Sequence, residues 1–223
     1  MKLEGRKKDI FDIMCEKKRI SVSELSKMLY VCEMTIRRDL SEMEKEGLIK
    51  RYRGGAIYIE GTELPITRRM YLSEDEKRIL AKKAEIYLAD NTTVFIDSSS
   101  TCHYIIPHIK KFNNIKIVTN SINALLSAAK LHIPCFLIGG EYYEQDMCFV
   151  GSVSEQYAKN INVDTAFFTT KGLSKDGIIS DTDLGQTMVR YSIMKNANKS
   201  IFLFEKEKNR QKISSYLVPC RYC

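Results

Sequence analysis

Short apolar segments alternate with stretches of helical periodicity over the second half of this 223-residue chain, and no other feature constrains its fold as much. The apolar segments have the length and composition of buried strands. Strands that alternate with helices at this spacing predict a Rossmann-like α/β domain, with a parallel sheet covered on both faces. The predicted strands are 93–97, 115–119, 135–138, 165–169 and 200–204, and the predicted helices are 102–111, 121–131, 153–161 and 184–197.

Polar and small residues follow these strands, and in parallel sheets ligands bind at the carboxyl ends of strands. Four hydroxyl residues enter the helix after the first strand, where hydroxyls and free amides can hold an anion. Runs of Ser and Thr also form turns, and Asp181 or Asp183 is equally suited to capping the next helix. The candidate ligand residues are Asp97, Ser98, Ser99, Ser100, Thr101, Asn120, Ser121, Gly139, Gly140, Lys171, Gly172 and Asp183.

The first 59 residues predict a separate, smaller domain that begins with three helices. An amphipathic helix opens the chain over 3–17. Ser21 and Glu24 then form a capping-box pattern, in which the hydroxyl and the carboxylate satisfy free amides at a helix start. Residues 30–32 interrupt the pattern, and a third helix follows over 33–45. Two short helices joined by a three-residue turn have the geometry of a helix-turn-helix.

The third helix presents a cationic face to solvent, and two strands around a Gly-Gly turn follow it as a basic hairpin. Positive charge is concentrated here, because residues 1–57 hold 14 basic and 10 acidic side chains, which is +4 of the net +7. The alternative to DNA binding is an ordinary three-helix cap whose charged face only contacts solvent. We expect double-stranded DNA as the partner, contacted by Ser21, Met34, Thr35, Arg37, Arg38, Ser41, Arg51 and Arg53.

A linker is expected between the two domains, because the helical periodicity lapses over 60–72. The α/β domain then spans 73–223 and opens with a second capping-box pattern, from Ser73 to Glu76. Seven cysteines, an odd number, favour a reducing compartment. The start lacks the apolar core of a secretory signal, and no run approaches the roughly 18 apolar residues of a membrane span. We therefore expect a cytoplasmic protein without a membrane partner.

Motifs that mark common cofactor and metal sites are missing from the sequence. It has no GxGxxG, GxxxxGK[ST] or HExxH pattern, and the three histidines show no ligand spacing. The CxxC pattern at 220–223 has no second pair nearby, whereas a zinc site needs four ligands. We therefore expect no cofactor, no metal site and no catalytic residues.

Three runs in the N-terminal domain are highly specific for one DNA-binding module: Thr35 to Leu40, Glu46 to Ile49 and Arg53 to Ala56. With these runs, and with Asp97 to Thr101 at the first strand end, the sequence resembles the DeoR family of bacterial transcriptional regulators. The resemblance covers residues 3 to 208. It implies a winged helix-turn-helix joined to a sensor domain similar to sugar-phosphate isomerases. Cys32 stands where the family usually has a serine cap, and a thiol caps a helix poorly.

By this resemblance, the protein is expected to be a sequence-specific repressor of carbohydrate metabolism genes that is controlled by a sugar-phosphate effector. Arg37 and Arg38 would contact operator DNA, and the residues at the strand ends would surround the effector. The family's chains continue beyond this sequence, so the resemblance predicts a truncated C-terminus. Proteins that read a duplex in this way work on paired half-sites, so we expect a homo-oligomer, either a dimer or a tetramer.

Two other function classes compete with this interpretation. A phosphosugar isomerase-like enzyme would use the same α/β architecture, but it would not require Arg37, Arg38 or the basic hairpin. An RNA-binding or scaffold protein is disfavoured, because the basic helix lacks the aromatic side chains that stack on bases in RNA-binding modules.

Overall fold

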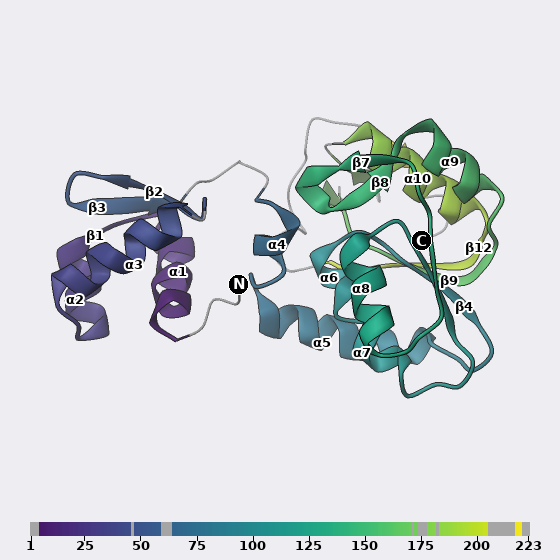
Figure 1. Cartoon of the computed structure of the whole chain (residues 1–223), viewed down its shortest axis with the longest axis horizontal. Coiled ribbons are helices and arrows are strands. Elements are labelled where there is room, and N and C mark those ends of the chain that lie inside the picture. Colours follow the sequence, from purple (N-terminus) through teal and green to yellow (C-terminus); the bar gives the residue numbers. More distant parts are fainter. Residues whose placement is uncertain are drawn as a thin grey trace. The chain divides into compact units, whose positions relative to one another are not determined.

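The computed structural model describes residues 5–45, 47–58, 64–170, 172–173, 178–181, 183–204 and 217–219. The chain divides into two compact units, Met1–Tyr71 and Leu72–Cys223 (Figure 1). The segment expected as a linker, 60–72, contains a short helix, α4 (Ile66–Arg69).

The first unit is a helix-turn-helix with a small antiparallel sheet, as predicted, but the sheet has a third strand that the sequence analysis missed. The sheet order is β1-β3-β2, so the missed strand β1 pairs with the far strand of the hairpin. The elements of this sheet and the helices beside it are α1 (Arg6–Lys17), β1 (Arg19–Ser21), α2 (Val22–Leu29), α3 (Glu33–Lys45), β2 (Ile49–Tyr52) and β3 (Gly55–Tyr58).

The hairpin turn lies one residue earlier than predicted, at Arg53 and Gly54. Gly54 has a φ of 97°, a left-handed conformation that glycine adopts at little cost. Gly55 belongs to β3, and a Cβ there would lie 2.4 Å from the carbonyl oxygen of Ile20 on β1. The second glycine therefore serves the close approach of the third strand.

Local sequence signals fix the helices of this unit. Ser21 caps α2 in a complete capping box, since its Oγ accepts from the backbone N–H of Glu24 and its own N–H donates to the Glu24 carboxylate. The apolar stripes of the three helices converge on one core that includes Met14, Leu25 and Leu40, all fully buried. The predicted helix-turn-helix is thus confirmed.

The second unit contains a five-stranded, all-parallel sheet in the order β12-β9-β4-β5-β6, which confirms the predicted α/β class. The sheet strands are β4 (Thr93–Ile96), β5 (Lys116–Thr119), β6 (Cys135–Leu137), β9 (Val163–Phe168) and β12 (Ala197–Phe202). The helices are α5 (Glu74–Ala84), η1 (Glu85–Tyr87), α6 (Ser100–His103), α7 (Ile106–Ile109), α8 (Ile122–Lys130), η2 (Glu144–Asp146), α9 (Gly151–Lys159) and α10 (Leu184–Lys195).

Helices cover both faces of this sheet, as Figure 1 shows. Val94 and Ile96 of β4 pack with residues of α5, α6, α7 and α8 in one apolar cluster. Phe95, between them in the sequence, packs with residues of α9 and α10 in a second cluster. This alternation follows from the two-residue period of a strand, and it explains why buried parallel strands read as continuous apolar runs.

Two features of this unit differ from the sequence analysis. Ser73 precedes α5 in a left-handed conformation, with a φ of 48°, and its side chain makes no capping hydrogen bond, so the second predicted capping box is wrong. Short antiparallel elements were also missed. They are the hairpin β7 (Glu141–Tyr143) with β8 (Cys148–Val150), and the sheet of β10 (Gly172–Leu173), β11 (Ile178–Ser180) and β13 (Leu217–Pro219).

Candidate functional site

The outer face of α3 carries the predicted DNA-contacting side chains. Met34 is 75% exposed, Arg37 and Arg38 are exposed, and Thr35 and Ser41 are half-buried. Arg37 Nη2 donates to Glu33 Oε2 one turn earlier, at 2.9 Å, which holds that side chain along the helix. The guanidinium of Arg38 makes no ion pair with the residues that the structure describes. Arg38 is therefore the more available of the two cations.

The opposite face of α3 is locked to α1 by ion pairs that the sequence analysis missed. Asp39 is buried and accepts two hydrogen bonds from Arg6, at 2.5 Å from Nε and 3.2 Å from Nη2. Lys7 pairs with Glu42 one turn further along. Bidentate Arg–carboxylate pairs fix orientation as well as distance. The exposed face of α3 is thus held in a defined rotation about the helix axis.

The remaining predicted DNA residues are Arg51 and Arg53 of the β2–β3 hairpin and Ser21 at the start of α2. Arg53 is exposed in the turn of the β2–β3 hairpin, where it has no ion-pair partner within the described part of the chain. The backbone N–H of Arg51 donates to Glu44 at 2.8 Å, and its guanidinium lies 4.0 Å from the same carboxylate. The hydroxyl of Ser21 is already engaged in the capping box.

In the second unit, the polar residues that follow β4 and β5 are buried together at one edge of the sheet. Ser98, Ser100 and Thr101 are each at most 4% exposed, and so are Asn120 and its neighbour Ser121. They lie at the carboxyl ends of adjacent strands, where ligands bind in parallel sheets. The structure thus brings the first seven predicted ligand residues into one layer.

Two of these hydroxyls have structural roles. The Oγ of Ser99 accepts from the backbone N–H of Cys102 at 3.0 Å and caps α6. The Oγ of Ser121 accepts from Ala124 at 3.3 Å and caps α8. Both were predicted as ligand residues, and both are engaged with helix starts.

Asn120 brings a buried polar atom without a hydrogen-bond partner among the described residues into this layer. Its Nδ2 donates to the backbone oxygen of Phe149 at 2.9 Å. Its Oδ1 is buried and accepts no hydrogen bond from the residues described. An unsatisfied buried oxygen costs free energy, roughly 1–3 kcal/mol, so a hydroxyl or amine of a ligand would relieve it.

A buried ionic network adjoins this layer through Asp97 and centres on Arg190 of α10. Its Nε donates to Asp97 Oδ1 at 3.0 Å, its Nη1 pairs with Asp181, and its Nη2 donates to Gln186 Oε1 at 2.9 Å. Burial raises the pKa of Asp97 above its usual range, and the attraction of Arg190 offsets this only in part. The arrangement ties the end of β4 to the segment before α10.

Gln186 extends the network to the hydroxyl layer and to the β7–β8 hairpin. Its Nε2 donates to Asp146 Oδ2 at 2.7 Å, and its Oε1 accepts from the Ser98 hydroxyl at 3.3 Å. Its backbone N–H donates to Asp183 Oδ1 at 2.7 Å, so Asp183 caps α10. The capping role considered for Asp183 is therefore the observed one. Cys148 lies beside Ser98, and burial raises the pKa of its thiol to about 12, which keeps it neutral.

Of the two glycines after β6, Gly140 lies tightly against protein atoms and Gly139 does not. A Cβ on Gly140, which has a φ of 153°, would lie 2.0 Å from Ser154 Oγ and 2.7 Å from the carbonyl oxygen of Val150. Gly139 has open space around its Cβ position. The close approach at Gly140 is thus to α9. Of the predicted cation and its neighbour, Lys171 lies outside the described residues, and Gly172 begins β10.

Arg190, Gln186 and Asp146 are site residues that the sequence analysis missed. Arg190 and Gln186 stand within a predicted helix, where single polar residues usually read as solvated positions. Asp181, one of two acidic residues just before that helix, was the available sign of this network. The ion pair of Asp97 with Arg190 was not foreseen, because these two residues lie 93 positions apart in the sequence.

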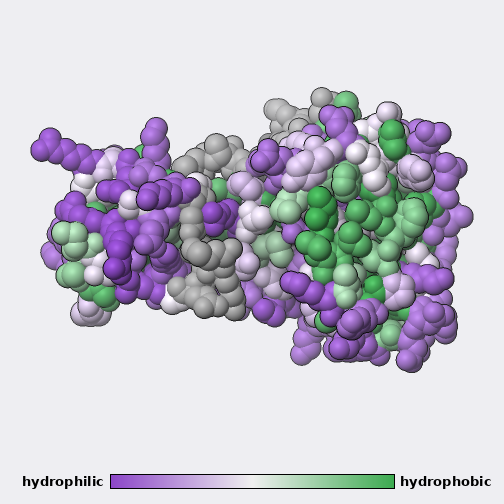
Figure 2. Space-filling model, viewed as in Figure 1, coloured by the Kyte–Doolittle hydropathy of each residue, from purple (hydrophilic) through white to green (hydrophobic). Residues whose placement is uncertain are grey.

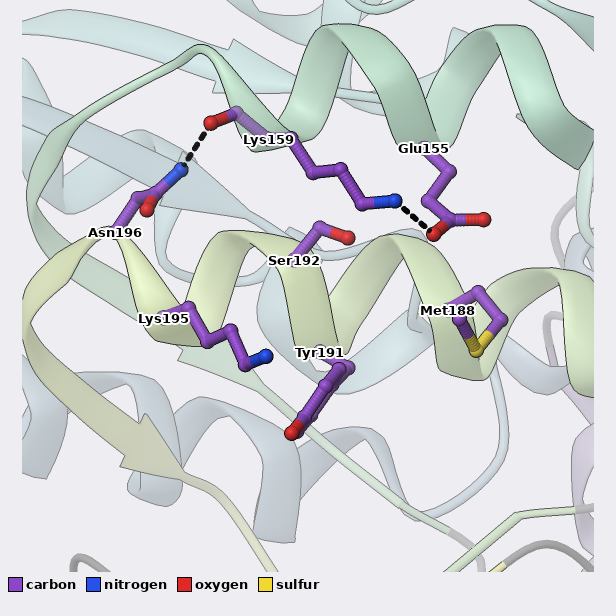
Figure 3. Close-up of a pocket in the computed structure, with 7 residues that line it drawn as sticks. All are labelled: Glu155, Lys159, Met188, Tyr191, Ser192, Lys195 and Asn196. Carbon is purple, nitrogen blue, oxygen red and sulfur yellow. Dashed lines mark hydrogen bonds and ion pairs between the residues drawn. The ribbon is translucent and has the colours of Figure 1, made fainter.

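A separate hollow of about 280 Å³ lies between α9 and α10 (Figure 3). None of the predicted ligand residues lines it. Lys159 pairs with Glu155 one turn earlier on α9 at 2.6 Å, and the Lys195 ammonium lies 4.4 Å from the centre of the Tyr191 ring. The cations at this hollow are therefore already engaged with protein groups.

Comparison with known proteins assigns the chain to a family. Residues 6–62 match the DeoR-like helix-turn-helix domain, and residues 72–221 match the DeoR C terminal sensor domain. The fold and these matches define a helix-turn-helix transcription regulator with a sensor domain. The chain belongs to the DeoR family. The predicted family, fold class and DNA-binding regulatory function are thus confirmed.

Individual relatives agree with this assignment. The chain is 27% identical over 206 residues to the HTH-type transcriptional regulator GolR of Listeria innocua, covering 91% of this chain and 81% of that protein. It is 26% identical over 210 residues to the glycerol-3-phosphate regulon repressor of Escherichia coli, covering 93% and 83%. Ribose 5-phosphate isomerase A of Methanocaldococcus jannaschii is 18% identical with a TM-score of 0.47. That match covers 63% of this chain and little more than half, 56%, of the isomerase.

No helix among the described residues is long and apolar enough to cross a membrane. No group of three or more His, Cys, Asp or Glu side chains in the described ranges is placed to hold a metal ion.

Proposed function

We propose that this protein represses carbohydrate metabolism genes by binding operator DNA through α3 and the β2–β3 hairpin, and that a sugar phosphate bound in the second unit changes its affinity for the operator. The observation that carries the effector half is the buried polar layer at the strand ends, with the unsatisfied Oδ1 of Asn120 in it. The names of the relatives support the same class of regulon.

The charges of the layer suggest which part of such a ligand would contact which residues. The described groups around it include the carboxylates of Asp97, Asp146 and Asp181 and one buried guanidinium, that of Arg190. Carboxylate and amide oxygens accept hydrogen bonds from sugar hydroxyls, whereas a phosphate needs donors. We assign the phosphate to the hydroxyls and amides of 98–101, and the sugar hydroxyls to Asn120.

For the DNA half, the proposal assigns base or phosphate contacts to the exposed cations of α3 and the hairpin. Arg38 and Arg53 are exposed and have no ion-pair partner among the residues described, whereas Arg37 must first leave Glu33. An arginine that reads a base contributes roughly 1–3 kcal/mol of discrimination, and one that contacts phosphate changes the salt dependence instead.

The DNA half is tested by fluorescence anisotropy with duplex DNA from upstream of the protein's own gene. Arg38→Ala should weaken binding by roughly 1–3 kcal/mol, or lower the salt slope by about one if the contact is to phosphate. Arg78→Ala, on the surface of α5, is the matched control and should bind as the wild type does. Equal affinity of the Arg38 variant at all salt concentrations would contradict the assignment of α3 as the reading helix.

The effector half is tested by repeating the titration with a panel of sugar phosphates and the corresponding free sugars. Ser100→Asp should abolish the response while leaving operator binding intact, because a buried carboxylate repels the phosphate. Ser152→Asp, at an exposed position in the first turn of α9, is the control. A wild type that responds to no sugar phosphate would defeat the sensor proposal, as would a Ser100 variant that responds normally. The alternative function, a phosphosugar isomerase-like enzyme, predicts turnover of the sugar phosphate in the same samples.

A further inference from the structure

The parallel sheet of the second unit ends in a strand whose outer side pairs with no strand within the described ranges. This strand is β6, the last in the order β12-β9-β4-β5-β6. The backbone N–H of Ile138 donates to the carbonyl of Thr119 on β5 at 2.8 Å, so Ile138 and Phe136 direct their backbone groups inward. Because successive residues alternate, Cys135 and Leu137 direct theirs outward. The outer edge therefore offers two N–H and two C=O groups for pairing.

The side chains at this edge are apolar and exposed. Phe136 is 51% exposed at the centre of β6, Leu126 of α8 is 52% exposed, and Tyr142 of β7 is 49% exposed. Figure 2 shows a hydrophobic area on this part of the molecule, at the place of α8 in Figure 1 and next to it. Proteins usually block open sheet edges with charged residues or proline, but β6 contains neither. A contiguous exposed apolar patch on a strand edge marks an interaction surface.

We propose that this edge patch, formed by β6 with Leu126 and Tyr142, binds a second copy of the chain. The two β6 strands pair antiparallel across a two-fold axis that passes through Phe136. In this register Cys135 of each copy exchanges hydrogen bonds with Leu137 of the other, so all four outward groups on each strand are satisfied. A two-fold contact uses the same patch on both partners, which an edge strand with its own copy provides.

Charge at the two ends of β6 favours this occupant over an unrelated chain. Exposed Lys130 and His132 precede the strand, and exposed Glu141 and Glu144 follow it. In an antiparallel pair, the basic end of one copy lies opposite the acidic end of the other. A helix-turn-helix that reads a duplex also works on paired half-sites, which requires two copies. The proposal concerns the free protein, so its failure would leave the assignments of operator and effector sites standing.

Disulfide cross-linking tests the register directly. Residues opposite each other in a non-hydrogen-bonded antiparallel pair have Cα atoms about 4.5 Å apart, which is within disulfide range. Phe136→Cys in the full-length chain should therefore form a covalent dimer on mild oxidation, with a 136–136 linked peptide identified by mass spectrometry. Ile79→Cys, similarly exposed on α5, is the control and should cross-link no more than the wild type does.

Dissociation of the dimer supplies the second measurement. Phe136→Glu places two like charges opposite each other and should raise the dimer dissociation constant at least about tenfold in analytical ultracentrifugation. Ile79→Glu should leave it unchanged, and circular dichroism checks that both variants fold. A wild type that is monomeric at micromolar concentration would overturn the proposal. So would a wild-type dimer in which Phe136→Cys gives no 136–136 peptide, even if Phe136→Glu fails to fold.

Discussion

Replacing Arg190 with methionine should destabilise the second unit by about 3–5 kcal/mol at neutral pH. The substitution keeps the length of the side chain but leaves the carboxylates of Asp97 and Asp181 buried without their cation. The side chain of Arg190 is 11% exposed, and those of Asp97 and Asp181 are 1% and 8% exposed, so water cannot replace the lost contacts. Removing one partner from a buried ion pair typically costs this much, because the remaining charge is uncompensated.

The pH dependence of this loss separates an electrostatic cause from a packing defect. Burial already raises the pKa of Asp97 above its ordinary value of 3.8, and removing the guanidinium raises it further. A raised folded-state pKa means that the folded protein binds a proton more readily than the unfolded chain, so acidification stabilises the fold in that range. The variant should gain more than the wild type as the pH falls toward 3.8, and the difference between them should shrink.

Hydrogen exchange followed by mass spectrometry suits this test, because it reports the opening free energy of the two units separately. Lys159→Met is the matched control. It breaks the exposed i,i+4 pair with Glu155, in which Lys159 is 61% exposed, and should cost less than about 0.5 kcal/mol. A loss below about 1 kcal/mol for Arg190→Met, or a loss that does not shrink on acidification, would refute the reasoning.

Substitutions at three further features can be tested by thermal or chemical unfolding. Burial lowers the pKa of His103 to about 4, so stability should fall as the pH drops from 6.5 toward 4, and His103→Gln should reduce that slope by up to roughly 1.4 kcal/mol per pH unit; an unchanged slope would contradict it. Cys32→Ser, at an exposed position, should stabilise the helix-turn-helix by roughly 0.5–1 kcal/mol, because a hydroxyl caps α3 better than a thiol does, and a lower melting temperature would contradict this capping argument. Gly140→Ala should cost about 1–3 kcal/mol through its clash with Ser154, whereas Gly139→Ala, with open space, should cost much less; equal costs would disprove the packing role.

The elements that could be predicted from the sequence are those specified by neighbours in the chain. The capping box at Ser21 needs only residues three apart, and it formed as predicted. The same pattern at Ser73 did not form, because that residue adopts a left-handed conformation in which its hydroxyl makes no capping bond. A local motif therefore predicts a helix start only where the preceding backbone can be extended.

The elements that were missed depend on distant partners. β1 has three residues and becomes a strand through its pairing with β3, with Ser21 opposite Gly55. The Arg190 network joins residues that are four and 93 positions apart, and no periodicity encodes such a distance. The strand-end residues were predictable because a topological rule places the carboxyl ends of parallel strands at one edge, whatever their separation in the sequence.

The network also limits how a bound ligand can act on the second unit. A ligand hydroxyl that reaches Asn120 lies in the same buried layer as Ser98, whose own hydroxyl donates to Gln186. Gln186 in turn contacts Arg190 and Asp146, so a change at the hydroxyl layer alters bonds that hold the first turns of α10 and the η2 turn. Burial of the charges leaves little room for intermediate arrangements, since each broken bond exposes an unpaired group to an apolar interior. Effector binding should therefore shift this unit between discrete hydrogen-bonded states, with α10 and the β7–β8 hairpin as the elements that change.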